Sequence, residues 1–204
     1  MITKLISLFT FIIFLPLVTM GCATNTSNKA TSSTGSPSVA ITASYDLDLV
    51  QDVRELVSKA DLVVHAIPVG EVEKTVSGRN NLHASYQQDI AIKEVLKGES
   101  PGPKISVIRG GINQEARSSL EETNPDVGVF IEDEEKLGGA LIPGDQILFL
   151  MLSKTDPVYA VVIGSKQGQF LLNEEGRVAE GNEFSIFDRL TVDDVRDKIE
   201  ELSN

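Results

Sequence analysis

Two histidines are the side chains of this chain best suited to acid–base or metal chemistry near neutral pH, because a histidine titrates in that range and its neutral ring ligates zinc. His65 stands in the apolar run 61–69, where a histidine is typically packed and hydrogen-bonded in a core. His83 opens a second predicted strand, so the two rings could pair across adjacent strands. Two histidines without a cysteine supply at most half of a zinc site. We expect no metal centre and no bound cofactor.

A run of acids between residues 115 and 135 is the most distinctive local feature, with eight acids and one base. Calcium needs several oxygens that converge on one point, but the chain has no D-x-D-x-D-G loop, and charge runs typically form solvated excursions. We expect residues 112–140 to be a solvated loop that meets a partner, either a basic protein segment or a cation. The candidate binding surface consists of Glu121, Glu122, Asp126, Glu132, Asp133, Glu134 and Glu135.

The common catalytic motifs are absent from the sequence: it contains no G-x-S-x-G, S-x-x-K, HExxH, G-x-x-x-x-G-K or G-x-G-x-x-G pattern. Paired carboxylates for glycoside hydrolysis usually work beside aromatic sugar platforms, and several aromatic residues here lie in apolar strands, where core packing is expected. We predict no catalytic residues and a protein that is not an enzyme. The alternative that the sequence leaves open is a hydrolase that uses carboxylates with His65 or His83.

The single cysteine, Cys22, follows a segment typical of a secretion signal. Lys4 supplies a basic start, residues 5–20 carry no charge, and Pro16 disfavours a continuous spanning helix. The stretch 18–22, VTMGC, resembles the lipobox of bacterial lipoproteins, although that family more often has Leu where this chain has Thr19.

In the lipoprotein family, the cysteine sulfur is joined to a diacylglycerol carrying fatty acids such as palmitate, and the signal is removed before the cysteine. The resemblance implies cleavage between Gly21 and Cys22 and lipidation of Cys22. Two acyl chains on one residue anchor a protein stably, whereas one chain does so only marginally. The implied location is the outer face of the cytoplasmic membrane of a Gram-positive bacterium.

The charge balance excludes nucleic acid as a partner, and the cysteine count excludes a disulfide-stabilised scaffold. The chain has 18 Lys and Arg against 30 Asp and Glu, a formal net charge of −12, whereas a nucleic-acid binder needs a basic face. One cysteine cannot form a disulfide within its own chain. An acidic body is repelled by an anionic membrane, so the lipid on Cys22 must provide the attachment.

Composition divides the chain into three parts. Residues 1–21 are the signal peptide. Residues 22–44 are rich in Ala, Ser, Thr and Asn, have little to bury and are predicted to be a disordered tether. Residues 45–204 are predicted to form a single globular, β-rich domain.

Hydrophobic periodicity predicts the elements of that domain. Apolar residues at helical spacing predict an amphipathic helix over 46–59 and a second over 191–202, where Thr191 and Asp194 resemble a capping box. Apolar runs and alternation predict strands at 61–69, 82–95, 104–109, 127–131, 146–152, 158–163, 169–172 and 177–178.

Several short motifs resemble an uncharacterised extracytoplasmic domain of Gram-positive lipoproteins: EVLKG at 94–98, Gly110-Gly111, Pro143-Gly144-Asp145 before an apolar strand, and Gln167-Gly168-x-Phe170. Their order is similar to that of OB-like barrels such as the netrin and metalloprotease-inhibitor modules. The expected fold is mainly β with flanking helices (α+β). It is a small OB-like antiparallel barrel of about six or seven strands with an N-terminal amphipathic helix and a C-terminal helix.

These observations favour a lipid-anchored cell-envelope lipoprotein that acts as a non-enzymatic binding or accessory module for an unidentified ligand or envelope protein. Besides the hydrolase, a second alternative to the binding module is a module that resembles the extracellular protease inhibitors. Those inhibitors chelate the protease metal through an N-terminal cysteine, whereas Cys22 is predicted to be acylated and far along a tether. The inhibitory mechanism is therefore not carried over.

Replacing the predicted lipid acceptor, Cys22→Ala, should abolish metabolic labelling of the protein with fatty acid, because no other cysteine can accept the diacylglycerol. The variant should move to the medium or accumulate as unprocessed precursor. Persistent labelling in the variant would mean that the lipobox assignment is wrong.

Overall fold

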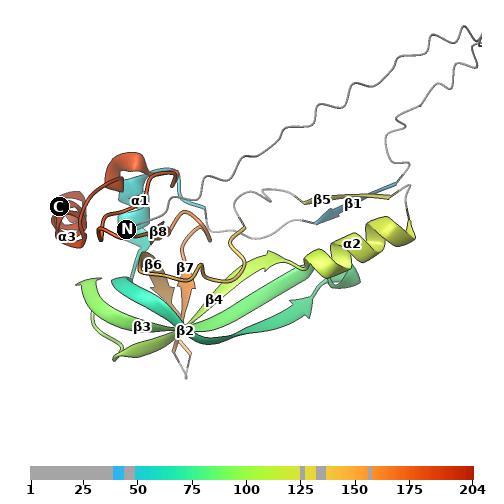
Figure 1. Ribbon diagram of the computed structural model, residues 1–204, viewed down its shortest axis with the longest axis horizontal. Coiled ribbons are helices and arrows are strands. Elements are labelled where there is room, and N and C mark those ends of the chain that lie inside the picture. Colours follow the sequence, from blue (N-terminus) through green and yellow to red (C-terminus); the bar gives the residue numbers. More distant parts are fainter. Residues whose placement is uncertain (1–38, 44–48, 125–126, 132–136, 156–157) are drawn as a thin grey trace, which may run out of the picture. The chain divides into compact units, whose positions relative to one another are not determined.

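The computed structural model describes residues 39–43, 49–124, 127–131, 137–155 and 158–204 (Figure 1). The signal segment, Cys22, Asp126 and the acids at 132–135 lie outside the described residues, so what the sequence indicates for them stays a prediction. Of the helices that are described, none has the length and apolar character needed to cross a membrane.

The described residues form three α-helices and eight strands, joined by turns and two short 3-10 helices. The helices are α1 (Val53–Lys59), α2 (Gln114–Thr123) and α3 (Val192–Ser203). The strands are β1 (Val39–Ala43), β2 (Leu62–Ser77), β3 (His83–Lys97), β4 (Lys104–Ile112), β5 (Val127–Ile131), β6 (Gln146–Leu152), β7 (Tyr159–Val162) and β8 (Gln169–Leu171). The expected α+β class is confirmed.

Six strands form one sheet in the order β2-β3-β4-β7-β6-β8. β6 is paired along both of its edges: β2 lies on one edge, and β7 and β8 share the other. The pairing of β4 with β7 is parallel, and all other pairings in this sheet are antiparallel. The expectation that all strands pair antiparallel is therefore corrected, because the six-stranded sheet is mixed. Sequence periodicity could not reveal this, because it gives the length of a strand but not the direction of its neighbour.

Two clusters of buried apolar side chains lie on opposite faces of β6. Ile147 and Phe149 belong to the first, which we call the helix-side cluster, together with residues of α1, α3 and the chain after β8. Leu148 and Leu150 belong to the second, the inner cluster, to which β2, β3, β4 and β7 also contribute. The strand predicted at 61–69 is buried on both faces over its residues 62–64 for the same reason, since Val63 joins the helix-side cluster and Val64 the inner cluster.

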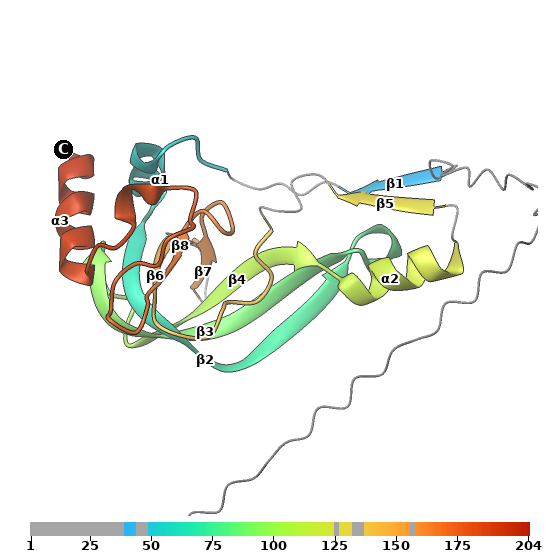
Figure 2. The same ribbon diagram turned by 45° about the horizontal axis from the view of Figure 1, so that its top comes forward.

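The helix-side cluster is centred on three phenylalanines whose rings pack against one another. Phe149, Phe170 and Phe187 have ring centroids 5.1 to 5.7 Å apart, with two of the three pairs edge to face. Such arrangements suit the quadrupole of aromatic rings. α1 and α3 contact each other and lie side by side in both ribbon views (Figures 1 and 2), while α1 also contacts β6 and α3 contacts β3.

The ends of the two flanking helices follow local capping chemistry. Asp52 accepts a hydrogen bond from the Glu55 amide at 2.9 Å, so α1 begins at Val53 rather than at the predicted residue 46. The capping box that was predicted for α3 is confirmed: Asp194 N–H donates to Thr191 Oγ1, and Thr191 N–H donates to the Asp194 carboxylate.

The prediction of a solvated loop over 112–140 is wrong for Gln114–Thr123, which form α2. The strand predicted at 127–131 is present as β5, and the described residues 137–140 belong to no helix or strand. α2 has no completely buried residue, and the side chain of Asn113 does not cap it. Neither an apolar stripe nor a capping motif therefore predicts this helix from the sequence. Instead, Lys74 on β2 donates to Asn113 Oδ1 at 2.8 Å, a long-range contact that links the start of the helix to the β2–β3 hairpin.

A short parallel pair lies outside the six-stranded sheet. β1 and β5 are paired from Val39 opposite Val127 to Ala43 opposite Ile131. β1 falls inside the range 22–44 that the sequence predicts to be a disordered tether, so the structure differs from that prediction for these five residues. Their sequence, VAITA, contains β-branched residues that favour a strand once a partner is present.

Candidate ligand pocket

His65 lies on β2 beside Asp145, which directly precedes β6. Its Nε2 is 2.8 Å from Asp145 Oδ1, and the Lys93 ammonium on β3 contacts the same oxygen. The hydrogen bond from Lys93 lowers the pKa of Asp145 below its ordinary value; desolvation opposes this, and His65 lowers the pKa further. The three side chains form an ion-pair cluster that connects β2, β3 and the start of β6.

The two histidines do not meet. His65 stands opposite Glu94 in the β2–β3 ladder, whereas His83 stands opposite Ser77 at the other end of it. A pairing of the two rings across adjacent strands is therefore excluded. Neither ring lines the pockets described for this chain, and within the described ranges no three His, Cys, Asp or Glu side chains are grouped to hold a metal ion.

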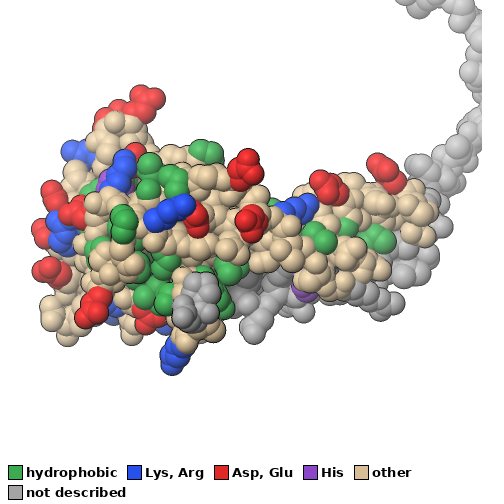
Figure 3. All heavy atoms as spheres, turned by 90° about the horizontal axis from the view of Figure 1, so that it is seen from below, with side chains coloured by type: hydrophobic (Ala, Val, Ile, Leu, Met, Phe, Trp, Pro, Cys, Tyr) green, Lys and Arg blue, Asp and Glu red, His purple; other side chains and the backbone are tan. Residues whose placement is uncertain are grey.

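Two members of the candidate acidic surface can be placed. Glu121 and Glu122 are exposed at the C-terminal end of α2, and Arg117 Nε lies 3.4 Å from Glu121 Oε1 on the same helix. The other five members lie outside the described residues, so the surface as a whole stays a prediction. On the face seen in Figure 3, acidic and basic side chains are interspersed with hydrophobic ones.

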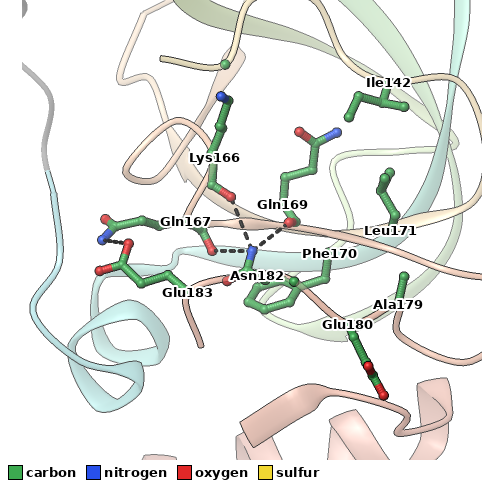
Figure 4. A pocket seen from close by; sticks show the side chains of 12 residues that line it. Ile142, Lys166, Gln167, Gln169, Phe170, Leu171, Ala179, Glu180, Asn182 and Glu183 are labelled. Carbon is green, nitrogen blue, oxygen red and sulfur yellow. Dashed lines mark hydrogen bonds between the residues drawn. The ribbon is translucent and has the colours of Figure 1, made fainter. Parts of the chain in front are cut away.

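A pocket of about 440 Å³ lies beside β8, in a part of the molecule for which the sequence predicted no binding site (Figure 4). Phe170 and Leu171 of β8 form its apolar wall, and Ile142, from the segment before β6, lies on another side. The segment 179–183 closes the remaining side. A volume of several hundred Å³ with apolar walls and a few polar groups is typical of small-molecule sites.

The side chain of Asn182 fixes the segment 179–183 beside β8. Its Nδ2 donates to the backbone oxygen of Gln169 at 2.9 Å and lies 3.3 to 3.4 Å from those of Lys166 and Gln167, as Figure 4 shows. Its Oδ1 accepts a hydrogen bond from the Phe184 amide at 2.9 Å. One side chain thus ties two chain segments together, so hydrogen bonds within the protein hold this wall in place.

Gln167 likewise ties chain segments together, because its side chain connects the pocket wall with Val50 near the start of the domain. Its Oε1 accepts from the Val50 amide at 2.9 Å, and its Nε2 donates to the Val50 carbonyl and to Glu183 Oε2. Gly164 makes room for it: a Cβ there would lie 2.2 Å from Gln167 Oε1, and the backbone has φ of +55°. A larger residue at 164 would displace this amide.

A buried pair of amides links the pocket to β6. Gln169 Nε2 donates to Gln146 Oε1 at 2.5 Å, and Gln146 Nε2 donates to the Ile142 carbonyl at 3.2 Å. Both glutamines are buried, and a buried amide without partners would be costly. The pair therefore fixes the position of the segment that carries Ile142.

The guanidinium of Arg109 on β4 lies behind the pocket wall at Gly138. Arg109 is 2% exposed and donates to the carbonyls of Ala140 and Ser165 at 3.3 and 3.2 Å. Burial lowers the pKa of Arg109 to about 10, so the group remains charged at neutral pH. Arg109 Nε and the buried Ser165 hydroxyl have no hydrogen-bond partner among the described residues.

Sequence reasoning gave none of these pocket residues a binding role. The available signal was the presence of Gln146 and Gln169 at the starts of apolar strands and of Gln167 directly before Gly168. Amides in segments that must be buried require partners, so they mark positions where the chain is fixed to another segment.

Replacing Asp145 by Asn should lower the free energy of unfolding at neutral pH and should also make that free energy depend less on pH in the acid range. The pKa of Asp145 is lowered in the folded protein from its ordinary 3.8, so its contribution is present above pH 3.8 and is lost as the pH falls through the folded-state pKa. Asp145→Asn should cost about 0.5 to 1 kcal/mol at pH 7, as expected for a partly exposed ion pair.

The difference between the Asp145→Asn variant and the wild type should shrink below pH 3.8 in chemical denaturation series. Asp197→Asn, which removes the same charge from the exposed face of α3, serves as the control. A constant difference across the acid range would show that the carboxylate of Asp145 has no such role.

The chain was compared with protein-family models and with curated proteins, and neither comparison gives a match.

Proposed function

We propose that this protein is a non-enzymatic binding module, attached to the outer face of the cytoplasmic membrane through lipid on Cys22, that binds a small ligand in the pocket beside β8. One observation carries the proposal: the pocket of about 440 Å³ has apolar walls whose positions are fixed by buried amides. Preformed walls lower the entropy cost of binding, because they need not be ordered by the ligand.

The strand pairings support an OB-like barrel as the frame of this module. They run from β2 through β3, β4 and β7 to β6, and β6 pairs with β2 again. The inner cluster receives side chains from each of these five strands, as the interior of a small barrel requires. β8 extends the edge of β6 beyond the ring, and the pocket lies against this extension.

A hydrolase is the second candidate, and the contact between His65 and Asp145 favours it. A general base needs a carboxylate or a similar group at hydrogen-bond distance, and 2.8 Å satisfies this requirement. However, the same Asp145 oxygen also accepts a hydrogen bond from Lys93, and neither His65 nor Asp145 lines the pocket. The geometry is that of an ion pair that connects three strands, so the binding module is the better supported function.

The pocket is tested by filling it. Ala179 is half-buried in the pocket wall, so Ala179→Trp should occupy the space that a ligand needs. A set of small neutral aliphatic and aromatic compounds, titrated into the full-length protein, should shift the amide resonances of Gly138 and Gly181 in the wild type. The substitution should weaken the best compound at least about tenfold, or ~1.4 kcal/mol.

The matched control is Ala116→Trp, which adds the same side chain on α2, whose residues do not line the pocket. Thermal unfolding of both variants checks that they are folded. Compounds that bind the Ala179→Trp variant as well as the wild type, or that leave both glycine amides unshifted, would show that the pocket is not a binding site.

A further inference from the structure

We infer that the pocket beside β8 selects neutral ligands that carry a hydrogen-bond donor, such as a hydroxyl or an amide N–H, on an apolar body. This inference rests on the proposed binding function and names the chemistry of its ligand. The donor would bind Gln169 Oε1, and the apolar body would contact Ile142 and Leu171.

The hydrogen bonds of the buried glutamine pair leave one oxygen without a donor. The carbonyl oxygen of Ile142 can only accept, so the amide of Gln146 must present its Nε2 to it, at 3.2 Å. Gln146 Oε1 then faces Gln169 and accepts from Gln169 Nε2 at 2.5 Å. The orientation of both amides is fixed in this way, and Gln169 Oε1 accepts no hydrogen bond from the residues that the structure describes.

This oxygen is open to the pocket. Gln169 lines the pocket although the residue is only 8% exposed, and Figure 4 shows its side chain extending from β8 toward Ile142. Among the described residues, the fully buried side-chain atoms without a partner do not include Gln169 Oε1, so this oxygen keeps accessible surface. The amides of Asn182 and Gln167, which also line the pocket, have partners at both nitrogen and oxygen.

Apolar surface surrounds the accessible oxygen. Ile142 is 50% exposed, and Leu171 and Ala179 are half-buried in the pocket lining. An apolar ligand body would remove this surface from water, which is favourable. A ligand that covered Gln169 Oε1 without offering a donor would leave a desolvated acceptor unpaired, which is costly.

The charged side chains of the lining do not call for a charged ligand. Glu180 pairs with Arg189, and Glu183 accepts a hydrogen bond from Gln167 Nε2 at 2.9 Å. Lys166 also interacts within the protein. A charged head group would therefore lose its hydration in the pocket without gaining a counter-ion, whereas a neutral donor loses much less.

The test compares four compounds with the same ring: cyclohexanol, cyclohexanone, cyclohexylammonium and cyclohexanecarboxylate. Each is titrated into the full-length protein, and the amide resonances of Gly138 and Gly181 report binding. Cyclohexanol should bind at least about fivefold more tightly than cyclohexanone, which accepts hydrogen bonds but does not donate them. It should exceed both charged compounds by at least about the same factor.

A double variant locates the preference. Gln146→Met together with Gln169→Met replaces both amides of the pair by apolar side chains, so no buried amide is left unpaired and the fold should persist. The preference for cyclohexanol over cyclohexanone should fall to about twofold or less. The matched control combines Gln51→Met with Gln87→Met, the same changes at two exposed glutamines outside the pocket lining, and should keep the preference.

Thermal unfolding shows whether both double variants are folded, and the wild type gives a readout that needs no substitution. Saturating cyclohexanol should shift the side-chain amide resonances of Gln169 more than saturating cyclohexanone does, because only the hydroxyl donates to Oε1. Equal shifts by the two compounds would contradict a hydrogen bond to this oxygen.

The remaining outcomes separate the inference from the proposed function. Equal or tighter binding of cyclohexanone, or of either charged compound, would overturn the inference while the proposed function stands. A preference for cyclohexanol that survives in a folded Gln146→Met, Gln169→Met variant would also overturn it, because the donor would then bind elsewhere. Failure of all four compounds to bind would contradict both the inference and the proposed function.

Discussion

The burial of β6 on both faces and its pairing on both edges is the constraint on which the rest of the structure depends. Its first five residues are completely buried, and their side chains alternate between the helix-side cluster and the inner cluster. The strand can satisfy its backbone only if β2 occupies one edge and β7 with β8 the other. The positions of α1, α3 and the aromatic cluster follow, because they cover its outer face.

The pocket is a consequence of this arrangement. β8 extends along β6 for only three residue pairs, and its other edge is covered by the segment 179–183 through one backbone hydrogen bond, from the Ala179 amide to the Leu171 carbonyl, and through side-chain contacts. Asn182 and Gln167 provide those contacts, and the Gln146–Gln169 pair fixes the opposite side. Buried amides stabilise a structure little when satisfied, but they cost much when a partner is lost. They therefore select one arrangement of the walls.

The elements with strong hydrophobic periodicity could be predicted from the sequence. The strand at 146–152 and the capped helix after Thr191 are present at the expected places. The strand predicted at 61–69 is present as the first part of β2, which continues to Ser77. α2 could not be predicted, because its residues bury little and its start is fixed by Lys74, distant in sequence. The parallel pairing of β4 with β7 could not be predicted either, because strand direction depends on the whole chain path.

The pocket could not be predicted for a related reason. Its walls come from three separate segments, and one of them is held by the contact of Gln167 with Val50, 117 residues apart. A sequence shows that an amide in an apolar segment needs a partner, but not which one. His65 illustrates the converse, since a residue type that suggests chemistry lies here in an ion-pair cluster outside the pocket.

Amide hydrogen exchange in the wild-type, full-length protein tests most directly whether the pocket is formed before any ligand binds. The Ala179 amide donates to the Leu171 carbonyl, and the Phe184 amide donates to Asn182 Oδ1. A preformed wall predicts that both amides are protected from exchange, and that Asn182→Ala accelerates both while the Phe149 amide of β6 keeps its protection. Exchange of both amides at unprotected rates in the wild type would contradict a preformed pocket.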